Sequence, residues 1–261
     1  MTATPPLTER LILPEGLAAS SFPDDWKGPK AHLAPTKSTP MGKALMGKTN
    51  SALCTLGAGA LLWAAGRLAA VADVRPLNDM AETLLLWERD PRYYHRIGPR
   101  HLQEAVPAPR EAVETLCAKT TAIFKDSPGK HISDPPVQTI EDLISVTRFL
   151  LGPDWLSAFR TWVTSAIATF DRIAANPHQD FRGRFDFGSV AEWEAHKALN
   201  MGPPLPIEAC NAGFDLGPEA CAALYHDFAR SVDPAANIYL APAEVMAELG
   251  FAGAPYGSGA G

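Results

Sequence analysis

The densest group of side chains that could bind a ligand or react lies in residues 89–101, which hold four arginines, two histidines and two tyrosines. An arginine guanidinium donates paired hydrogen bonds to a carboxylate or a phosphate, and a tyrosine ring can stack on a base or a sugar. Arg96 and His101 would also suit a site in which the arginine holds a phosphate ester and the histidine moves a proton. The alternative is a solvated turn whose arginines pair with the protein's own acids. The candidate binding residues of this cluster are Arg92, Tyr93, Tyr94, His95, Arg96, Arg100 and His101.

Acidic residues are concentrated in the last part of the chain. The 261 residues include 23 basic and 29 acidic ones, a formal net charge of −6. Residues 186–261 alone hold two basic and ten acidic residues, so their balance is 2 − 10 = −8. Such a segment repels nucleic-acid phosphates and attracts basic proteins. We therefore expect a basic protein partner and no nucleic acid, with Asp215, Glu219 and Asp227 among the contact residues.

Residues 42–49 match the phosphate-loop pattern G-x-x-x-x-G-K-[ST]. That loop works only when a hydrophobic strand precedes it and a helix follows, so that backbone donors meet the phosphates. Here Pro35 and Pro40 lie just before the motif, and a proline-rich stretch cannot form a central strand. The sequence therefore predicts no nucleotide and no other cofactor at this position.

Other catalytic and metal-binding patterns are incomplete. Glu192 and His196 lie four residues apart on one predicted helix face, but a helical di-metal site needs two Glu-x-x-His units. The four cysteines form no Cys-x-x-Cys pair, and the serine pattern of a hydrolase nucleophile is missing. We therefore assign no catalytic residue and no metal ligand.

One segment raises the question of a membrane. Residues 52–72 carry a single charge, Arg67, and are long enough to cross a bilayer. Their many alanines and glycines gain little from lipid, and a central arginine is costly there, so we expect a buried core helix and no membrane partner. The first residues show no secretory signal, and the cysteines suit reduced, buried thiols, so we expect a cytoplasmic protein.

Hydrophobic spacing after residue 50 is helical, and strand signals are nearly absent. We predict an all-α fold: an irregular bundle of roughly eight helices with an extended proline-rich N-terminal arm. Residues 1–49, with seven prolines, would form the arm, residues 50–254 a single helical domain, and residues 255–261 a flexible tail. Ser189 with Glu192, and Thr139 with Asp142, are predicted to cap two of the helices.

These patterns favour a non-enzymatic helical binding or inhibitor protein that uses its acidic C-terminal third. One biological form would be an immunity-type protein that neutralises a basic toxin enzyme. Two alternatives stay open. One is an enzyme that binds an anionic or nucleotide-like substrate at residues 89–101, and the other is an assembly component that reaches a neighbouring subunit through the N-terminal arm.

Overall fold

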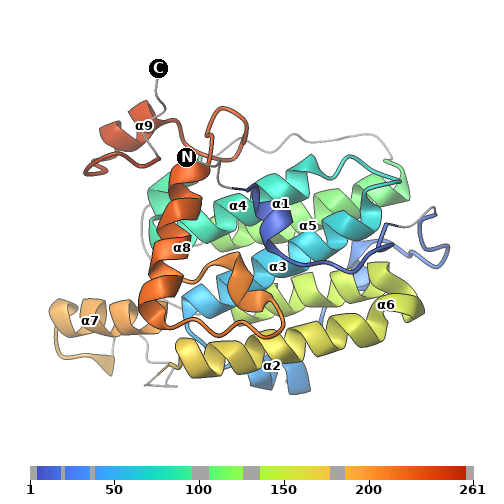
Figure 1. Cartoon of the computed structure of the whole chain (residues 1–261), viewed down its shortest axis with the longest axis horizontal. Coiled ribbons are helices and arrows are strands. Elements are labelled where there is room, and N and C mark those ends of the chain that lie inside the picture. The colour runs from blue at the N-terminus through green and yellow to red at the C-terminus, as the bar shows by residue number, and fades with distance from the viewer. Residues whose placement is uncertain are drawn as a thin grey trace.

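A computed structural model describes residues 5–18, 21–35, 39–95, 106–125, 136–176 and 186–256. Within these ranges the prediction of an all-α fold is confirmed, since the described residues form helices and no β-strand. Their β-type pairing is limited to two isolated bridges, Lys48 with Ala175 and Tyr94 with Leu240. Three short 3-10 turns, η1 (Pro29–Ala31), η2 (Pro91–Tyr93) and η4 (Ile207–Cys210), join the helices. The described helices are α1 (Leu7–Arg10), α2 (Pro40–Leu45), α3 (Asn50–Leu68), α4 (Arg75–Arg89), α5 (Ala108–Lys125), α6 (Val137–Ile173), α7 (Val190–Met201), α8 (Pro218–Ser231) and α9 (Ala243–Glu248) (Figure 1).

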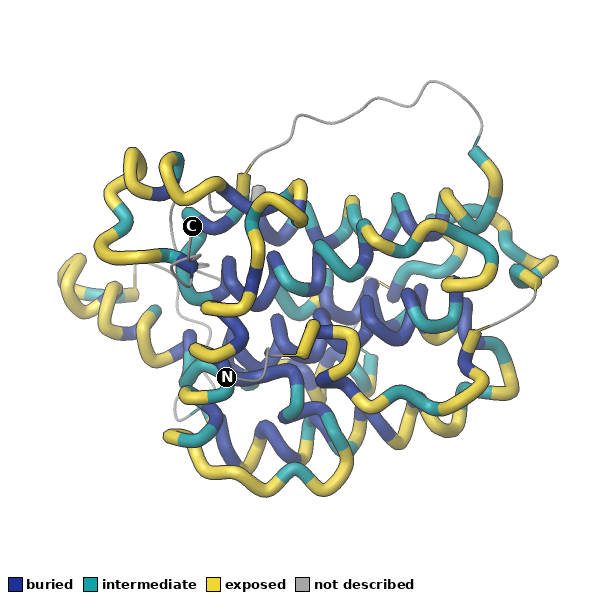
Figure 2. The backbone as a smooth tube through the Cα atoms, turned by 45° about the horizontal axis from the view of Figure 1, so that its top comes forward, coloured by how far each residue is buried: buried dark blue, intermediate teal, exposed yellow. Residues whose placement is uncertain are grey.

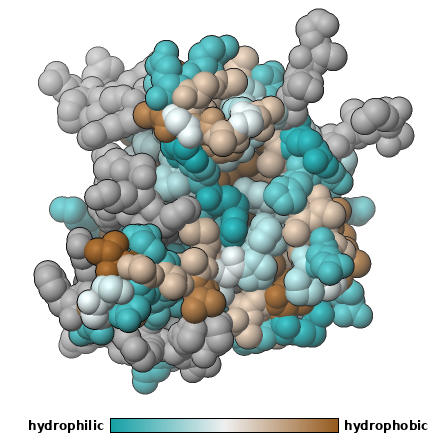
Figure 3. All heavy atoms as spheres, turned by 90° about the vertical axis from the view of Figure 1, so that its left-hand side faces the viewer, coloured by the Kyte–Doolittle hydropathy of each residue, from teal (hydrophilic) through white to brown (hydrophobic). Residues whose placement is uncertain are grey.

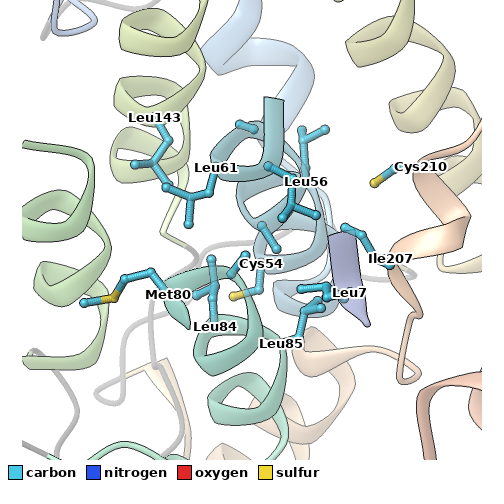
Figure 4. Close-up of a cluster of buried hydrophobic side chains, with 14 of the residues drawn as sticks. Leu7, Cys54, Leu56, Leu61, Met80, Leu84, Leu85, Leu143, Ile207 and Cys210 are labelled. Carbon is cyan, nitrogen blue, oxygen red and sulfur yellow. The ribbon is translucent and has the colours of Figure 1, made fainter. Parts of the chain in front are cut away.

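Helix α3 forms the centre of the bundle. Seventeen of its nineteen residues are buried, which agrees with a helix that is apolar on every side. Its side chains cluster with those of α4, α6 and η4 (Figure 4), and the exposed residues lie around this buried centre (Figure 2). Among the described helices, α3 alone is long and apolar enough to cross a membrane, but 89% of its most apolar window is buried inside the protein.

Glycines let neighbouring helices approach α3 closely. A Cβ on Gly57 would lie 2.6 Å from Ile140 Cδ1, and a Cβ on Gly59 would lie 2.6 Å from Trp162 Cζ2. Both distances are shorter than any normal contact, so the two halves of α6 occupy space that only a glycine leaves free. Trp162 is held in turn by Trp63 and Phe159, whose ring centroids lie 5.8 and 5.4 Å away.

We expect Gly59→Ala to lower the free energy of unfolding by about 1–3 kcal/mol, because the added methyl must displace a buried indole. The gain in helix propensity offsets only part of this loss. Urea denaturation followed by circular dichroism measures the change. Gly217→Ala is the matched control, since Gly217 has φ −77° and no atom within 4 Å of the new methyl. Equal stability of the two variants would contradict the close approach of α3 and α6.

Helix α6 bends sharply at one residue. Gly152 has φ 66° and ψ −173°, which divides the helix at a glycine followed by Pro153, two residue types that interrupt helices. The predicted cap at Thr139 is wrong, because the helix begins at Val137. Asp142 accepts a hydrogen bond from the Ala34 backbone (3.0 Å) and pairs with Lys119 (2.7 Å) instead.

The described part of residues 1–49 lies against the helices instead of extending from them. Leu7, Leu11 and Leu17 are buried in the core, so apolar contacts hold this segment down. The Trp26 indole donates a hydrogen bond to Glu111 of α5 (2.7 Å), and the His32 ring stacks on Phe149 of α6 at 3.6 Å between centroids. The prediction of an extended arm is therefore not confirmed, since α1, η1 and α2 form in this segment and its leucines pack against the bundle.

The chain remains packed beyond the predicted end of the helical domain at residue 254. Tyr256 is buried, and its hydroxyl donates to the Ala241 carbonyl (2.7 Å). Pro255 accepts a hydrogen bond from Tyr93 (2.5 Å). Two residues of the predicted flexible tail are therefore part of the packed structure, and residues 257–261 lie outside the described ranges.

Candidate functional site

The described part of the 89–101 cluster contacts the C-terminal segment, residues 237–256, and holds it to the bundle. Arg92 pairs with Asp90 through two hydrogen bonds of 2.8 and 2.5 Å, and its guanidinium lies 4.9 Å from the centre of the Phe251 ring. Tyr93 is buried, and burial raises the pKa of its hydroxyl to about 12. These two side chains therefore have partners within the protein.

The next two residues continue this contact. The Tyr94 ring packs against Phe124 of α5 at 4.5 Å between centroids, and the exposed His95 donates its backbone N–H to Tyr239 (2.7 Å). The Tyr93 carbonyl accepts from the Ala241 backbone (2.8 Å). The predicted residues Arg96, Arg100 and His101 lie outside the described ranges.

We expect Tyr93→Phe to lower stability by about 1–2 kcal/mol, because the half-buried Pro255 carbonyl loses its hydrogen-bond donor. Limited proteolysis should then cut residues 242–256 faster than in the wild type, while cleavage elsewhere stays the same. Wild-type cleavage rates in this variant would show that Tyr93 does not hold the C-terminal segment.

The structure places the three predicted acidic residues on the surface. Asp215 pairs with Arg172 of α6 (3.1 Å), and Asp227 pairs with Arg230 one turn along α8. Glu219 is exposed in the first turn of α8, where a carboxylate is favoured by the helix dipole. Asp215 and Asp227 thus form ion pairs with the protein's own arginines, whereas Glu219 has no ion-pair partner among the described residues.

The acidic part of the chain gathers at one end of the molecule. Helices α7, α8 and α9 lie together on the left-hand side in Figure 1. Both basic residues there, Lys197 and Arg230, form ion pairs with neighbouring acids on their own helices. Figure 3 faces this end and shows apolar side chains scattered among hydrophilic ones.

The phosphate-loop pattern adopts a different structure from a phosphate loop. Residues 40–45 form α2, Gly47 turns the chain with φ 78°, and Thr49 caps α3 by accepting from the Ala52 N–H (3.3 Å). Lys48 pairs with Asp171 of α6. No strand precedes this segment in the described chain, so the structural context that phosphate binding needs is missing.

A buried polar network lies at the start of α3, and the sequence analysis did not identify it. Ser51 Oγ lies 2.6 Å from Glu88 Oε1 and 2.7 Å from the Met201 carbonyl. Arg89 Nη1 donates to the Gly202 carbonyl (2.9 Å) and lies 3.4 Å from Glu88 Oε1. Burial raises the pKa of Glu88 to about 7, although Arg89 and Ser51 both favour its charged form.

A separate set of polar contacts involves α7 and its neighbours. His196 Nε2 lies 2.9 Å from the Asn200 amide nitrogen, and Asn176 donates to the Asn200 amide oxygen (3.2 Å). The Asn50 amide oxygen is buried with no hydrogen-bond donor in the described structure. Glu192 accepts from the Gly188 N–H (2.9 Å), so this carboxylate is already engaged in capping α7.

A second group of titratable side chains links α4 to the C-terminal segment. Asn237 is buried and donates to Glu82 Oε2 (3.2 Å) and to the Asp79 carbonyl (2.9 Å). Partial burial and the nearby Glu82 raise the pKa of Asp79 to about 6. Burial also raises the pKa of Cys117 to about 12, so this thiol is a poor nucleophile.

Neither group has the composition of a metal centre. Within the described ranges, no three His, Cys, Asp or Glu side chains lie close enough to hold a metal ion. The four cysteines are free thiols.

Comparisons with protein-family models, with curated proteins and with solved structures find no match to this chain.

Proposed function

We propose that this protein is a non-enzymatic helical binding protein that holds a basic protein partner on the end formed by α7, α8 and α9. An inhibitor of the immunity type, which covers a basic toxin enzyme in the cytoplasm, is one form of this function. The observation that carries the proposal is the charge of this end. Ten acidic and two basic residues fall in the segment that builds it, and both basic residues are already paired.

Part of this negative charge is not compensated within the protein. Glu219 in α8, and Glu244 and Glu248 in α9, are exposed and form no ion pair with a described residue. Exposed like charges gain little from the protein itself, and they raise the association rate of an oppositely charged partner. These three carboxylates are the side chains that we assign to partner binding.

Apolar side chains on the same segment favour a protein over a small ion as the partner. Seven large hydrophobic residues are exposed in the described structure, and five of them belong to residues 186–256. Protein interfaces combine exposed apolar side chains with a charged rim. The five residues are Val190, Leu199, Leu216, Ile238 and Leu249.

The other two hypotheses have less support. Arg92 and Tyr93, which an anion site would need free, contact Asp90, Phe251 and Pro255 instead. The N-terminal segment, which an assembly role would need free, packs onto the protein's own core through Leu7, Leu11 and Leu17.

A capture experiment with matched charge changes tests the proposal. The wild type and the triple variant Glu219→Lys, Glu244→Lys, Glu248→Lys are immobilised, and proteins bound from a lysate of the expressing cells are quantified by mass spectrometry. We expect the wild type to retain a basic protein in a 1:1 ratio and the triple variant to lose it.

The control variant Glu15→Lys, Asp24→Lys, Asp154→Lys carries the same change in net charge. All three residues are exposed, and the segments that hold them lie at the opposite end of the molecule (Figure 1). This control should retain the partner as the wild type does. Identical sets of bound proteins on all three baits would overturn the proposal.

A further inference from the structure

The hydroxyl of Ser51 has one hydrogen and two close acceptors. Ser51 Oγ lies 2.6 Å from Glu88 Oε1 and 2.7 Å from the Met201 carbonyl oxygen. If Glu88 is protonated, it donates to Ser51, and Ser51 donates to Met201, so both short contacts contain a hydrogen. If Glu88 is ionised, its carboxylate is the stronger acceptor and takes the serine hydrogen. The Met201 carbonyl then loses its donor.

Arg89 responds to the same proton. Its Nη1 donates to the Gly202 carbonyl at 2.9 Å and lies 3.4 Å from Glu88 Oε1. A negative charge on Glu88 attracts the guanidinium away from the carbonyl, whereas a neutral carboxyl group does not. Ionisation of Glu88 therefore weakens both the hydrogen bond from Ser51 to the Met201 carbonyl and the hydrogen bond from Arg89 to the Gly202 carbonyl.

The two carbonyls belong to the C-terminal end of α7. The last carbonyls of a helix have no partner inside the helix and need donors from elsewhere. Gly202, at the helix end, has φ 76°, and a Cβ there would lie 2.6 Å from Thr49 Cβ. The end of α7 is thus seated directly against the start of α3, with Ser51 and Arg89 supplying its donors.

Glu88 is buried among few other titratable groups. Cys54 of α3 and Tyr225 of α8 both interact with its charge, and burial raises the pKa of each well above its usual value, so both stay neutral. Among the contacts of Ser51 and Arg89 with described residues, the end of α7 contributes the backbone carbonyls of Met201 and Gly202, and Arg89 is the charged neighbour of Glu88 on α4. Of Glu88, Cys54 and Tyr225, Glu88 is therefore the group whose pKa lies near neutral pH.

We propose that Glu88 is a proton-controlled latch, which fastens the C-terminal end of α7 to α3 and α4 when it is protonated and releases that end when it is ionised. Glu88 reaches α7 through Ser51 and Arg89, so its own role is one of positioning. Its raised pKa, near 7, places the change within the physiological range of pH.

Hydrogen exchange of the full-length protein tests the latch. Amide exchange in the last turn of α7 is measured by mass spectrometry at pH 5.5 and pH 8.5 and corrected for the intrinsic effect of pH. We expect this turn to exchange about tenfold faster at the higher pH in the wild type, which corresponds to the loss of about one net hydrogen bond. Amides in α5 should show no such change.

Two variants distinguish control of α7 by Glu88 from a pH-dependent loss of stability throughout the protein. Glu88→Gln cannot ionise and should keep the slow exchange of α7 at both pH values. Gly202→Ala forces the end of α7 away from Thr49 and should give fast exchange at both. Exchange that is independent of pH in the wild type, or that depends on pH equally in Glu88→Gln, overturns the proposal.

A measurement on the wild type alone covers the case in which a variant does not fold. The carboxyl carbon of Glu88 is titrated by ¹³C NMR, and its midpoint is compared with the pH at which α7 exchange accelerates. The latch requires the two midpoints to coincide, and a difference of more than about one pH unit contradicts it.

Discussion

Replacing Glu88 by glutamine is expected to stabilise the protein at pH 8 by about 3 kcal/mol and to change its stability little at pH 4. The pKa of Glu88 rises from 4.5, its ordinary value, to about 7 in the folded protein. The folded state therefore binds this proton more tightly than the unfolded state does. Stability from Glu88 is complete below pH 4.5, falls as the pH rises, and is lost above pH 7. Glutamine keeps the size of the side chain and cannot ionise, so the variant avoids this loss.

Urea denaturation of both proteins at several values between pH 4 and pH 8 measures the effect. Some decline with pH should remain in the variant, because burial also raises the pKa values of Asp79 and Glu82. Glu15→Gln, at an exposed position, is the control and should change stability by less than about 0.5 kcal/mol. A Glu88→Gln variant that is less stable than the wild type at pH 8 would mean that the charged form, paired with Arg89, stabilises the fold.

The largest effect on binding is expected from reversing the charges of Glu219, Glu244 and Glu248. Each substitution removes one attraction and adds one repulsion at an interface with a basic protein. Exposed ion pairs contribute about 0.2–1 kcal/mol each, so the three lost attractions and three new repulsions should together raise the dissociation constant at least about sevenfold. The association rate should account for much of this loss, because charge at the rim of an interface mainly steers encounter.

Surface plasmon resonance with the purified partner measures both rates. The control variant with lysine at positions 15, 24 and 154 should bind within about threefold of the wild type, because its changes lie at the far end of the molecule. If both triple variants weaken binding equally, net charge is responsible and the end formed by α7, α8 and α9 is not the interface.

Local patterns in the sequence predicted the helices well. Ser189 caps α7 by accepting from the Glu192 N–H at 3.2 Å, as the spacing of these residues predicts. The break at Gly152 and the close packing at Gly57 and Gly59 also follow from residue type. In each case the partners lie within a few residues of each other, or the absence of a side chain is itself the signal.

Contacts between distant segments escaped sequence reasoning. Asp142 caps no helix because its partner, the Ala34 backbone, lies 108 residues away in the chain. Ser51, Glu88 and Met201 come from three separate helices, so no local spacing connects them. A signal for Glu88 was present, since this glutamate continues the apolar stripe of Leu77, Ala81 and Leu84 on α4, where a charged residue is unusual.

The candidate site could be predicted only in part, because residue counts give the charge of a segment and not its contacts with other segments. Charge composition pointed to the C-terminal third, and the fold brings that third together at one end of the molecule. Composition could not show that Asp215 and Asp227 pair with Arg172 and Arg230, or that Glu244 and Glu248 lack such partners among the described residues. Ion pairs depend on side-chain geometry, which residue counts do not contain.

The salt dependence of partner binding tests the proposed interface most directly. The dissociation constant is measured between about 0.05 and 0.5 M salt for the wild type and for the Glu219, Glu244, Glu248 triple-lysine variant. We predict that wild-type affinity falls steeply as salt increases, and that the variant loses this dependence or reverses it. Equal salt dependence in the two proteins would contradict binding of a basic partner at this end of the molecule.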